Sequence, residues 1–244
     1  MISMGTRARA VLKRGRSTTA SMLSTLADRV APPPPKGRLK RVVGGSWERL
    51  GSLQFEYLKA EGLEPGSRLL DIGCGVLRGG RHFIDYLEPG HYWGIDAAQE
   101  MIDGARGEVV RSALDGKKPT LRQTDAFDVD FGVAFDFALA QSVFTHIPLN
   151  SIALCLHNVA QVLRPGGCFF ATYFPVPVGS DRWSPLKQPA EPGLQQVVTY
   201  GDRNPYHYEP EDFAWMCRDL PLEMSVRGLW GHPHNQQMIA FTRT

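Results

Sequence analysis

A short apolar run that ends in an acid and then in a glycine-rich turn constrains this chain more than any other feature. Residues 69–80 read LLDIGCGVLRGG. The apolar residues are typical of a strand buried on both faces, as in a parallel sheet. Gly73 and Gly75 allow a tight turn and the close approach of a ligand, because neither has a Cβ. A helix that begins near Gly79 or Gly80 would direct its free N–H groups at that ligand.

The spacing of the glycines separates two kinds of cofactor. The dinucleotide fingerprint is G-x-G-x-x-G, whose third glycine lets the helix pack closely on the strand. Here Arg78 takes the third place, and Asp71 stands two residues before the first glycine. The form Asp71-x-Gly73-x-Gly75 resembles the first motif of class I S-adenosylmethionine-dependent methyltransferases. In that family the acid serves the ammonium end of the methionine part of the cofactor.

A second acid follows at the distance that a nucleoside site requires. HYWGID, residues 91–96, predicts another buried strand, and Asp96 at its end lies 21 residues after Gly75. An acid at that place can accept both ribose hydroxyls of a nucleoside. Taken alone, Asp96 is also typical of a strand-end residue, so the interpretation depends on the segments that follow.

Further segments follow in the order of this family, and the resemblance covers residues 65–174, about 45 % of the chain. TLRQTDAFDVDF (120–131) resembles the third strand and its acid, which would place Asp125 and Ala126 at the adenine. FDFALAQSVFTHIP (135–148) resembles the fourth strand and the segment that closes over the methionine part. The resemblance implies S-adenosylmethionine as cofactor. The site residues that it implies are Asp71, Gly73, Cys74, Gly75, Arg78, Asp96, Ala97, Met101, Asp125, Ala126 and Gln141.

The alternation of strands and helices predicts an α/β fold with right-handed crossovers. The predicted helices span 46–62 with Ser46 as N-cap, 79–87, 98–115, 150–163 with Asn150 or Ser151 as N-cap, and 211–219. The predicted strands include 68–72, 91–96 and 119–124, and LRPGGCFFATYF (163–174) resembles the fifth strand of the family. The last strands, 222–229 and 236–243, are joined by so short a link that they must be antiparallel. The resemblance implies a doubly wound, mostly parallel seven-stranded sheet of order 3-2-1-4-5-7-6, with strand 7 antiparallel.

Charge is distributed unevenly along the chain, although the net charge is only +2. Residues 1–41 hold ten Lys and Arg against one acid, whereas the remainder holds 17 against 24. We interpret 1–41 as a basic N-terminal extension with a proline-rich linker at Pro32–Pro35, and 42–244 as the methyltransferase domain. The extension can contact nucleic acid, the domain itself, or an anionic membrane surface through residues 7–30, and a tail without contacts is the simplest alternative.

Composition argues against several other classes of protein. The chain is 43 % hydrophobic and 21 % charged, as ordinary globular proteins are, and it contains no apolar run near 18 residues. Its basic N-terminus lacks the apolar core of a signal peptide, so we expect a cytoplasmic protein. The four cysteines have no paired spacing, which favours reduced thiols and matches no zinc pattern.

Histidines and a long insertion mark the side on which the methyl acceptor is expected. Ligands of an open α/β sheet bind beyond the carboxyl ends of its strands, and His146, His207 and His232 lie in loops of that edge. A hydroxyl acceptor benefits from a general base, and histidine titrates nearest neutrality. His146 is the first candidate, with His207 and His232 as rivals, although His146 can also serve only to cap the turn before Pro148. The proline- and aromatic-rich insertion 175–209 is the predicted acceptor wall or lid.

Other side chains near this edge allow more than one interpretation. Arg78 and Arg81 can reach the methionine carboxylate or an anionic acceptor, or can lie on a solvated helix face. His232 and His234 resemble a pair of metal ligands but have no carboxylate nearby in sequence, so we predict no metal.

These features predict an enzyme that methylates a hydroxyl of a small molecule, such as a sugar, a lipid-linked compound or a secondary metabolite. AQSV (140–143) stands where nucleic-acid and glutamine N-methyltransferases have an amide–proline–aromatic motif that holds a planar amine. The absence of that motif argues against a nucleic-acid substrate and favours oxygen as the methylated atom. Three alternatives stay open: N-methylation of a small amine, an RNA-directed activity that uses the basic extension, and cofactor binding without catalysis. The oligomeric state is left open as well.

Overall fold

A computed structural model describes residues 47–244 of the chain. The predictions for the basic extension, the proline linker and Ser46 fall outside this range. The helices are α3 (Trp47–Ala60), α4 (Gly80–Tyr86), α5 (Gln99–Arg111), α6 (Leu149–Val162) and α7 (Pro210–Cys217), with a 3-10 turn at Asp115–Lys117. The strands are β1 (Leu69–Ile72), β2 (Tyr92–Asp96), β3 (Thr120–Gln123), β4 (Phe135–Ala140), β5 (Leu163–Tyr173), β6 (Leu186–Lys187), β7 (Val198–Thr199), β8 (Leu222–Leu229) and β9 (Gln237–Arg243).

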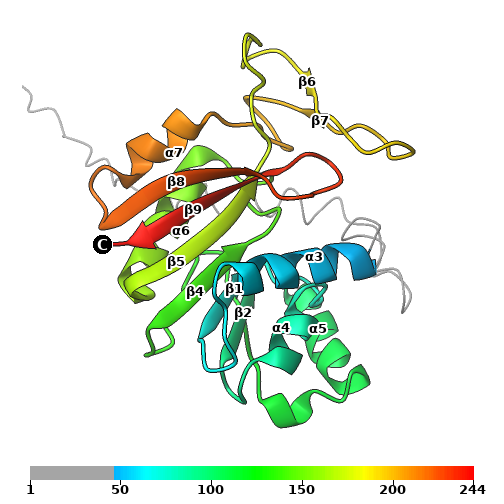
Figure 1. Cartoon of the computed structure of the whole chain (residues 1–244), viewed down its shortest axis with the longest axis vertical. Helices are drawn as coiled ribbons and strands as arrows, with labels where there is room; N and C mark the ends of the chain where they lie inside the picture. Colours follow the sequence, from blue (N-terminus) through cyan, green and yellow to red (C-terminus); the bar gives the residue numbers. More distant parts are fainter. Residues whose placement is uncertain (1–46) are drawn as a thin grey trace, which may run out of the picture. The chain divides into compact units, whose positions relative to one another are not determined.

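Seven strands form one sheet in the order β3-β2-β1-β4-β5-β9-β8 (Figure 1). Neighbours from β3 to β5 pair in parallel, whereas β9 pairs antiparallel with both β5 and β8. This confirms the predicted sheet order and the antiparallel seventh strand. The carboxyl ends of the parallel strands, the end of β8 and the start of β9 therefore lie at the same edge.

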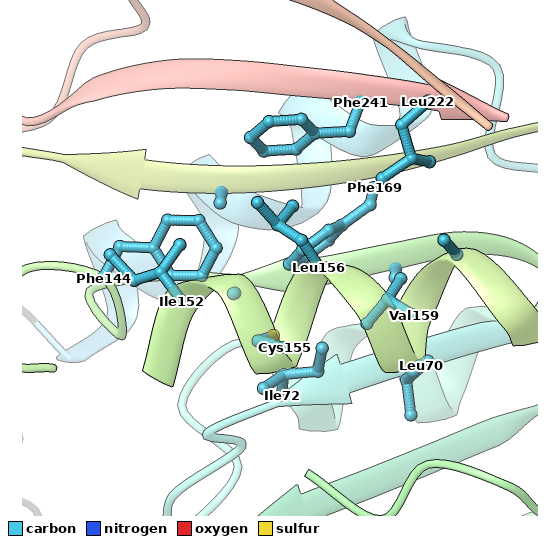
Figure 2. Close-up of a cluster of buried hydrophobic side chains, with 14 of the residues drawn as sticks. Leu70, Ile72, Phe144, Ile152, Cys155, Leu156, Val159, Phe169, Leu222 and Phe241 are labelled. Carbon is cyan, nitrogen blue, oxygen red and sulfur yellow. The ribbon is translucent and has the colours of Figure 1, made fainter. Parts of the chain in front are cut away.

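Two apolar clusters cover the two faces of the sheet. Residues of α6 and α7 pack on one face, and residues of α3, α4 and α5 pack on the other. Figure 2 shows how Ile152, Leu156 and Val159 of α6 lie among the side chains of the sheet. The apolar spacing of this helix predicts that face, since residues three and four apart lie on one side of a helix. No helix within residues 47–244 is long and apolar enough to cross a membrane.

Helix α6 begins one residue earlier than predicted, and its predicted cap is wrong. Pro148 occupies the N-cap position, and no side chain caps the helix. The carbonyl of Pro148 accepts the first helical hydrogen bonds, from the N–H groups of Ser151 and Ile152. Proline suits this boundary because it has no N–H that would need a partner.

Helix α5 ends at Arg111, four residues before its predicted end. Ala113 adopts a φ of 54°, in the left-handed region, so the chain leaves the helix there and enters the 3-10 turn. The apolar pattern of the sequence extends beyond Arg111, because Leu114 is apolar and is buried although it lies outside the helix.

Two glycines let helix α3 lie directly on the turn after β1. A Cβ on Gly51 would lie 2.4 Å from the backbone oxygen of Arg78. A Cβ on Gly79 would lie 2.3 Å from Oε1 of Gln54, a side chain of α3. The missing Cβ atoms thus bring α3 close to the glycine turn, where the site is expected.

Gly51→Ala tests this approach, since alanine would raise helix propensity but overlap a backbone oxygen. We expect a loss of about 1–3 kcal/mol in the free energy of unfolding, the usual cost of overpacking. Gly107→Ala in α5 is the matched control, because its Cβ would meet only the end of the Arg111 side chain, at 3.2 Å. That change should be neutral or stabilise by up to about 1 kcal/mol. Denaturant unfolding measures both, and equal effects of the two substitutions would contradict the close approach.

Candidate functional site

The glycine turn after β1 is held to the end of β2 by one carboxylate. Asp96 Oδ2 accepts the N–H of Gly75 at 3.0 Å, and Oδ1 accepts the N–H of Ala98 at 3.0 Å. The turn adopts φ values of 70° at Gly73 and 53° at Gly75, which glycine accommodates without strain. Burial raises the pKa of Asp96, while these N–H groups act in the opposite direction. The N–H of Ala97 lowers the pKa as well, and a carboxylate has about four lone-pair sites, so at least one is left for a ligand.

Beneath the turn, Asp71 is buried and bonded to a tyrosine. The hydroxyl of Tyr92 donates to Asp71 Oδ2 at 2.6 Å. A Cβ on Gly80 would lie 2.4 Å from that hydroxyl, so the second of the two consecutive glycines makes room for it. The pKa of Asp71 is raised to about 7, because burial, together with the nearby Asp96, outweighs the Tyr92 hydrogen bond and Arg78, which lower it.

The ends of β2 and β3 meet beside the turn. The N–H of Thr124 donates to the carbonyl of Asp96 at 3.0 Å, and Gln123 Nε2 donates to the carbonyl of Ala97 at 2.9 Å. The two residues predicted at the adenine, Asp125 and Ala126, are exposed just after β3. Met101, predicted on the same side, lies half-buried in the first turn of α5. These predicted residues therefore follow neighbouring strands at the expected edge.

The segment after β4 closes on the turn from the other side. A Cβ on Gly73 would lie 2.5 Å from Cγ2 of Val143, so this segment packs on the glycine itself. Gln141 Oε1 accepts a hydrogen bond from Arg78 at 2.6 Å and one from Gln54 Nε2 at 3.2 Å. The side chain of Cys74 is buried, which leaves its backbone as the part that lies in the turn.

The structure adds residues to the site that the sequence pattern did not indicate. Gln54 belongs to α3, and the segment after β4 is joined by polar side chains from β5 and from the residue before β9. Ser142 Oγ and Thr172 Oγ1 both donate to Gln236 Oε1, at 2.9 and 2.7 Å. No local motif marks these residues, because they come together only when the strands pair.

His207 holds parts of the insertion together. Its side chain is fully buried, and its Nε2 lies 2.7 Å from the carbonyl of Arg182, which can only accept. Its Nδ1 lies 2.9 Å from Oγ1 of Thr199. Because both ring nitrogens have partners within the protein, neither is left to act on a substrate.

His146 is exposed in the segment between β4 and α6, and its ring is oriented by an amide. Its Nδ1 lies 2.7 Å from Oδ1 of Asn204, a residue of the insertion. An amide oxygen only accepts, so Nδ1 carries the proton and the neutral ring has its lone pair on Nε2. Asn204 was not among the residues that the sequence analysis singled out.

His232 is buried in the loop between β8 and β9, with 9 % of its surface exposed. Its Nε2 lies 3.4 Å from Nε2 of Gln141. The loop thus reaches the segment after β4, as predicted for the edge that carries the glycine turn. Within residues 47–244, no three His, Cys, Asp or Glu side chains are placed to hold a metal ion.

Arg81, the other arginine considered for an anion, is engaged by α3. Its guanidinium pairs with Glu48 and lies over the ring of Trp47, with the ring centroid 5.7 Å away. Arg78 is instead largely buried beside Gln141, and burial lowers its pKa to about 10. Of the two, Arg78 is the one bonded to a predicted cofactor residue.

The insertion 175–209 extends from the end of β5 over this edge (Figure 1). It contains the short hairpin of β6 and β7. Arg182 pairs with Glu209 and Asp212, which form the capping box at the start of α7. Glu191 pairs with Arg49 of α3 at 2.5 Å, and its N–H donates to the carbonyl of Pro233 at 2.9 Å. The insertion is therefore tied to α3, α7 and the β8–β9 loop.

The residues at this edge fit S-adenosylmethionine on three observations. Asp96 keeps a lone pair for the ribose hydroxyls, Gly73 leaves exposed backbone without a Cβ, and Asp71 supplies a buried carboxyl below the turn. A nucleoside with a charged amino-acid end needs this combination of a diol acceptor, a close backbone and an acid.

Comparisons with known proteins agree with this fit. A family model described as a methyltransferase domain matches residues 70–169. A ubiquinone biosynthesis O-methyltransferase of Aromatoleum aromaticum is 27 % identical over 184 residues, 71 % of this chain and 71 % of that protein. A sterol 24-C-methyltransferase of Schizosaccharomyces pombe is 30 % identical over 109 residues, 44 % of this chain. The chain spans 28 % of the length of this sterol enzyme and 30 % of a matching uncharacterized protein of Methanocaldococcus jannaschii.

Solved structures show the same fold. The magnesium protoporphyrin IX methyltransferase of Synechocystis PCC 6803, solved with bound SAM, aligns with a TM-score of 0.56 and 14 % identity over 93 % of each chain. Sheet order, glycine turn and strand-end acid thus define an enzyme of the methyltransferase class. The family match over residues 70–169 and the shared fold support a class I S-adenosylmethionine-dependent methyltransferase.

Asp96→Ala tests the ribose role of this carboxylate. We expect S-adenosylhomocysteine to bind about 100-fold more weakly, since two charged hydrogen bonds cost on the order of 3 kcal/mol. Asp103→Ala, on the exposed surface of α5, is the control for loss of one negative charge. Titration calorimetry measures both affinities, and normal binding by the Asp96 variant would overturn the assignment.

The buried Asp71 predicts that cofactor affinity depends on pH. Below its pKa of about 7 the carboxyl is protonated and neutral, so its attraction for the cofactor ammonium is lost. We therefore expect the affinity for S-adenosylhomocysteine to fall by up to about tenfold per pH unit below this value and to level off above it. Calorimetry from pH 5.5 to 8.5 measures this curve.

Tyr92→Phe extends the same test. The Tyr92 hydrogen bond lowers the pKa of Asp71, so its removal should move the fall in affinity to higher pH. Tyr86→Phe is the control, because the Tyr86 hydroxyl donates to the carbonyl of Leu63 instead. An unchanged pH curve in the Tyr92 variant would exclude Asp71 as the titrating group.

Proposed function

We propose that this methyltransferase transfers the methyl group to a hydroxyl oxygen of a small molecule, with His146 as general base. The hydrogen bond between His146 Nδ1 and Asn204 carries the proposal, because it leaves Nε2 with a lone pair. When bound, S-adenosylmethionine supplies an electrophilic methyl group on a sulfonium. His146 Nε2 would accept the proton of the acceptor hydroxyl as its oxygen takes up the methyl group, and the cofactor sulfur would leave with the bonding electron pair. The products are a methyl ether and S-adenosylhomocysteine.

A cavity lined by residues that are close to His146 and Asn204 in sequence supports a small acceptor. Its volume is about 320 Å³, within the range of sites for small molecules. Three aromatic side chains of the insertion line it, together with the start of α6. The lining includes Pro148, two residues after His146, and both Asp202 and Tyr206, which flank Asn204. The insertion would then form the wall of the acceptor site.

The relatives support oxygen as the methylated atom. The ubiquinone biosynthesis O-methyltransferases of Aromatoleum aromaticum and Xanthomonas campestris match this chain over 71 % and 79 % of their own lengths. The sterol relative is named for C-methylation, but the match covers 28 % of its length. Membrane contact through residues 7–30 and a cytoplasmic location stay predictions, and an RNA-directed activity that uses the basic extension stays an alternative.

His146→Gln tests the base. We expect turnover of the hydroxyl acceptor to fall about 10²- to 10⁴-fold, the usual contribution of a general base, with S-adenosylhomocysteine affinity unchanged. His157→Gln, an exposed histidine of α6, is the matched control. Methylated products formed from cell extract with labelled cofactor are measured by mass spectrometry, which also identifies the acceptor. Full activity of His146→Gln toward an amine product would favour N-methylation instead.

The Asn204→Asp substitution tests whether His146 acts as a general base or only caps the turn. A carboxylate beside the ring stabilises its protonated form, so the acidic limb of the pH–rate profile should move to higher pH. A histidine that only caps the turn would leave the profile in place, and that result would contradict the proposal.

A further inference from the structure

Polar side chains from several elements converge at the carboxyl edge of the sheet, next to the glycine turn. They form one hydrogen-bonded network, most of it buried. The members are Gln54, Arg78, Gln141, Ser142, Thr172, His232 and Gln236. Such convergence of amides, a hydroxyl pair and an imidazole at a sheet edge is expected of a ligand site.

The orientation of the Gln141 amide follows from Arg78. A guanidinium only donates, so the group 2.6 Å from it must be the amide oxygen of Gln141. The NH₂ group of Gln141 then faces the other way. Its nitrogen Nε2 donates one hydrogen to Ser142 Oγ, 2.5 Å away, and has a second hydrogen to donate; His232 Nε2 lies 3.4 Å from the same nitrogen.

The tautomer of His232 follows from its own backbone loop. The N–H of His234 donates to Nδ1 of His232 at 3.2 Å, so Nδ1 carries the lone pair. A neutral imidazole with its lone pair on Nδ1 has its hydrogen on Nε2. His232 therefore presents an N–H donor to the site.

The ring stays neutral over the physiological range. Burial lowers the pKa of His232 to about 3, and the charges of His234, Arg78 and Arg49 lower it as well, against Glu191, which raises it. A ring in this state cannot take up a proton from an acceptor. Its Nδ1 already accepts the N–H of His234, and its Nε2 already carries a proton. This removes His232 as a rival to His146 for the role of base.

Two donors therefore face each other. Within residues 47–244, the partner of His232 Nε2 is the amide nitrogen of Gln141, which also donates. Buried donors in folded proteins almost always have an acceptor. An oxygen atom with two lone pairs that lies to one side of the pair, within hydrogen-bond distance of both nitrogens, would satisfy both N–H groups.

We propose that His232 and Gln141 form a two-donor clamp that holds an oxygen atom of a bound molecule beside the transferred methyl group. The oxygen comes from a hydroxyl or carbonyl of the acceptor or from the carboxylate of the cofactor. If the oxygen belongs to the acceptor, this inference rests on the proposed function. His232 is then a binding residue that selects molecules with such an oxygen.

Nitrogen-detected NMR of the imidazole rings tests the clamp in the full chain, with His232→Gln to assign the signal. We expect a neutral Nε2–H ring from pH 5 to 9. S-adenosylhomocysteine should move the Nε2–H signal if the cofactor carboxylate is held, whereas catechol or glucose added with it should move the signal if an acceptor oxygen is held. A ring that titrates in this range, a proton on Nδ1, or no movement with any of these molecules would overturn the proposal.

Two substitutions give an independent measure with cell extract and labelled cofactor. His232→Gln keeps an N–H donor, so product formation should stay within about threefold of wild type, whereas His232→Phe removes the donor and should lose at least about tenfold. The pH–rate profile should be unchanged in the glutamine variant. If the pH–rate profile of His232→Gln lost its acidic limb, His232 would be the base, and the proposed clamp would be wrong. Failure of the proposed function appears separately, as a His146→Gln variant that is fully active, and leaves the NMR result as it is.

Discussion

The bond between the Asp96 carboxylate and the N–H of Gly75 joins two strands at the point where the site is built. It holds the glycine turn of β1 against the end of β2, although 21 residues separate its partners. A second bond, to the N–H of Ala98, ties the same carboxylate to the start of α5. Strand end, turn and helix start are thereby fixed together at the place where we expect the nucleoside to bind. The neighbouring elements are arranged around this junction.

Close contacts at glycine residues place the neighbouring elements around this junction. Helix α3 reaches the turn because Gly51 and Gly79 have no Cβ, and the Tyr92 hydroxyl reaches Asp71 because Gly80 has none. The two consecutive glycines after Arg78 were interpreted as a helix start. Helix α4 does begin at Gly80, but the packing gives each glycine a separate task. The turn is therefore bounded on one side by α3 and below by a buried acid.

Hydrogen bonds distinguish three histidines that the sequence offers as candidate bases at one sheet edge. His207 uses both nitrogens within the insertion, His146 is oriented by Asn204 with Nε2 left over, and His232 accepts at Nδ1 from its own loop. Their proposed roles differ for that reason, since the position of the ring proton decides whether a neutral imidazole can act as base or as donor. The same edge thus holds both a proposed base, His146, and a proposed binding residue, His232.

The sequence by itself determined the fold and the cofactor, and it predicted which edge of the sheet carries the site. Those depend on local patterns: the spacing of Gly73 and Gly75, the acid at the end of β2, and strand runs whose order matches the family. Local patterns failed at the ends of α5 and α6, where Ala113 and Pro148 set the boundaries through backbone geometry. The polar network around Gln141, the Asn204 partner of His146 and the tautomer of His232 were decided only by the tertiary structure. They join residues as far as 94 positions apart, so their partners exist only after the strands pair and the loops close on one edge.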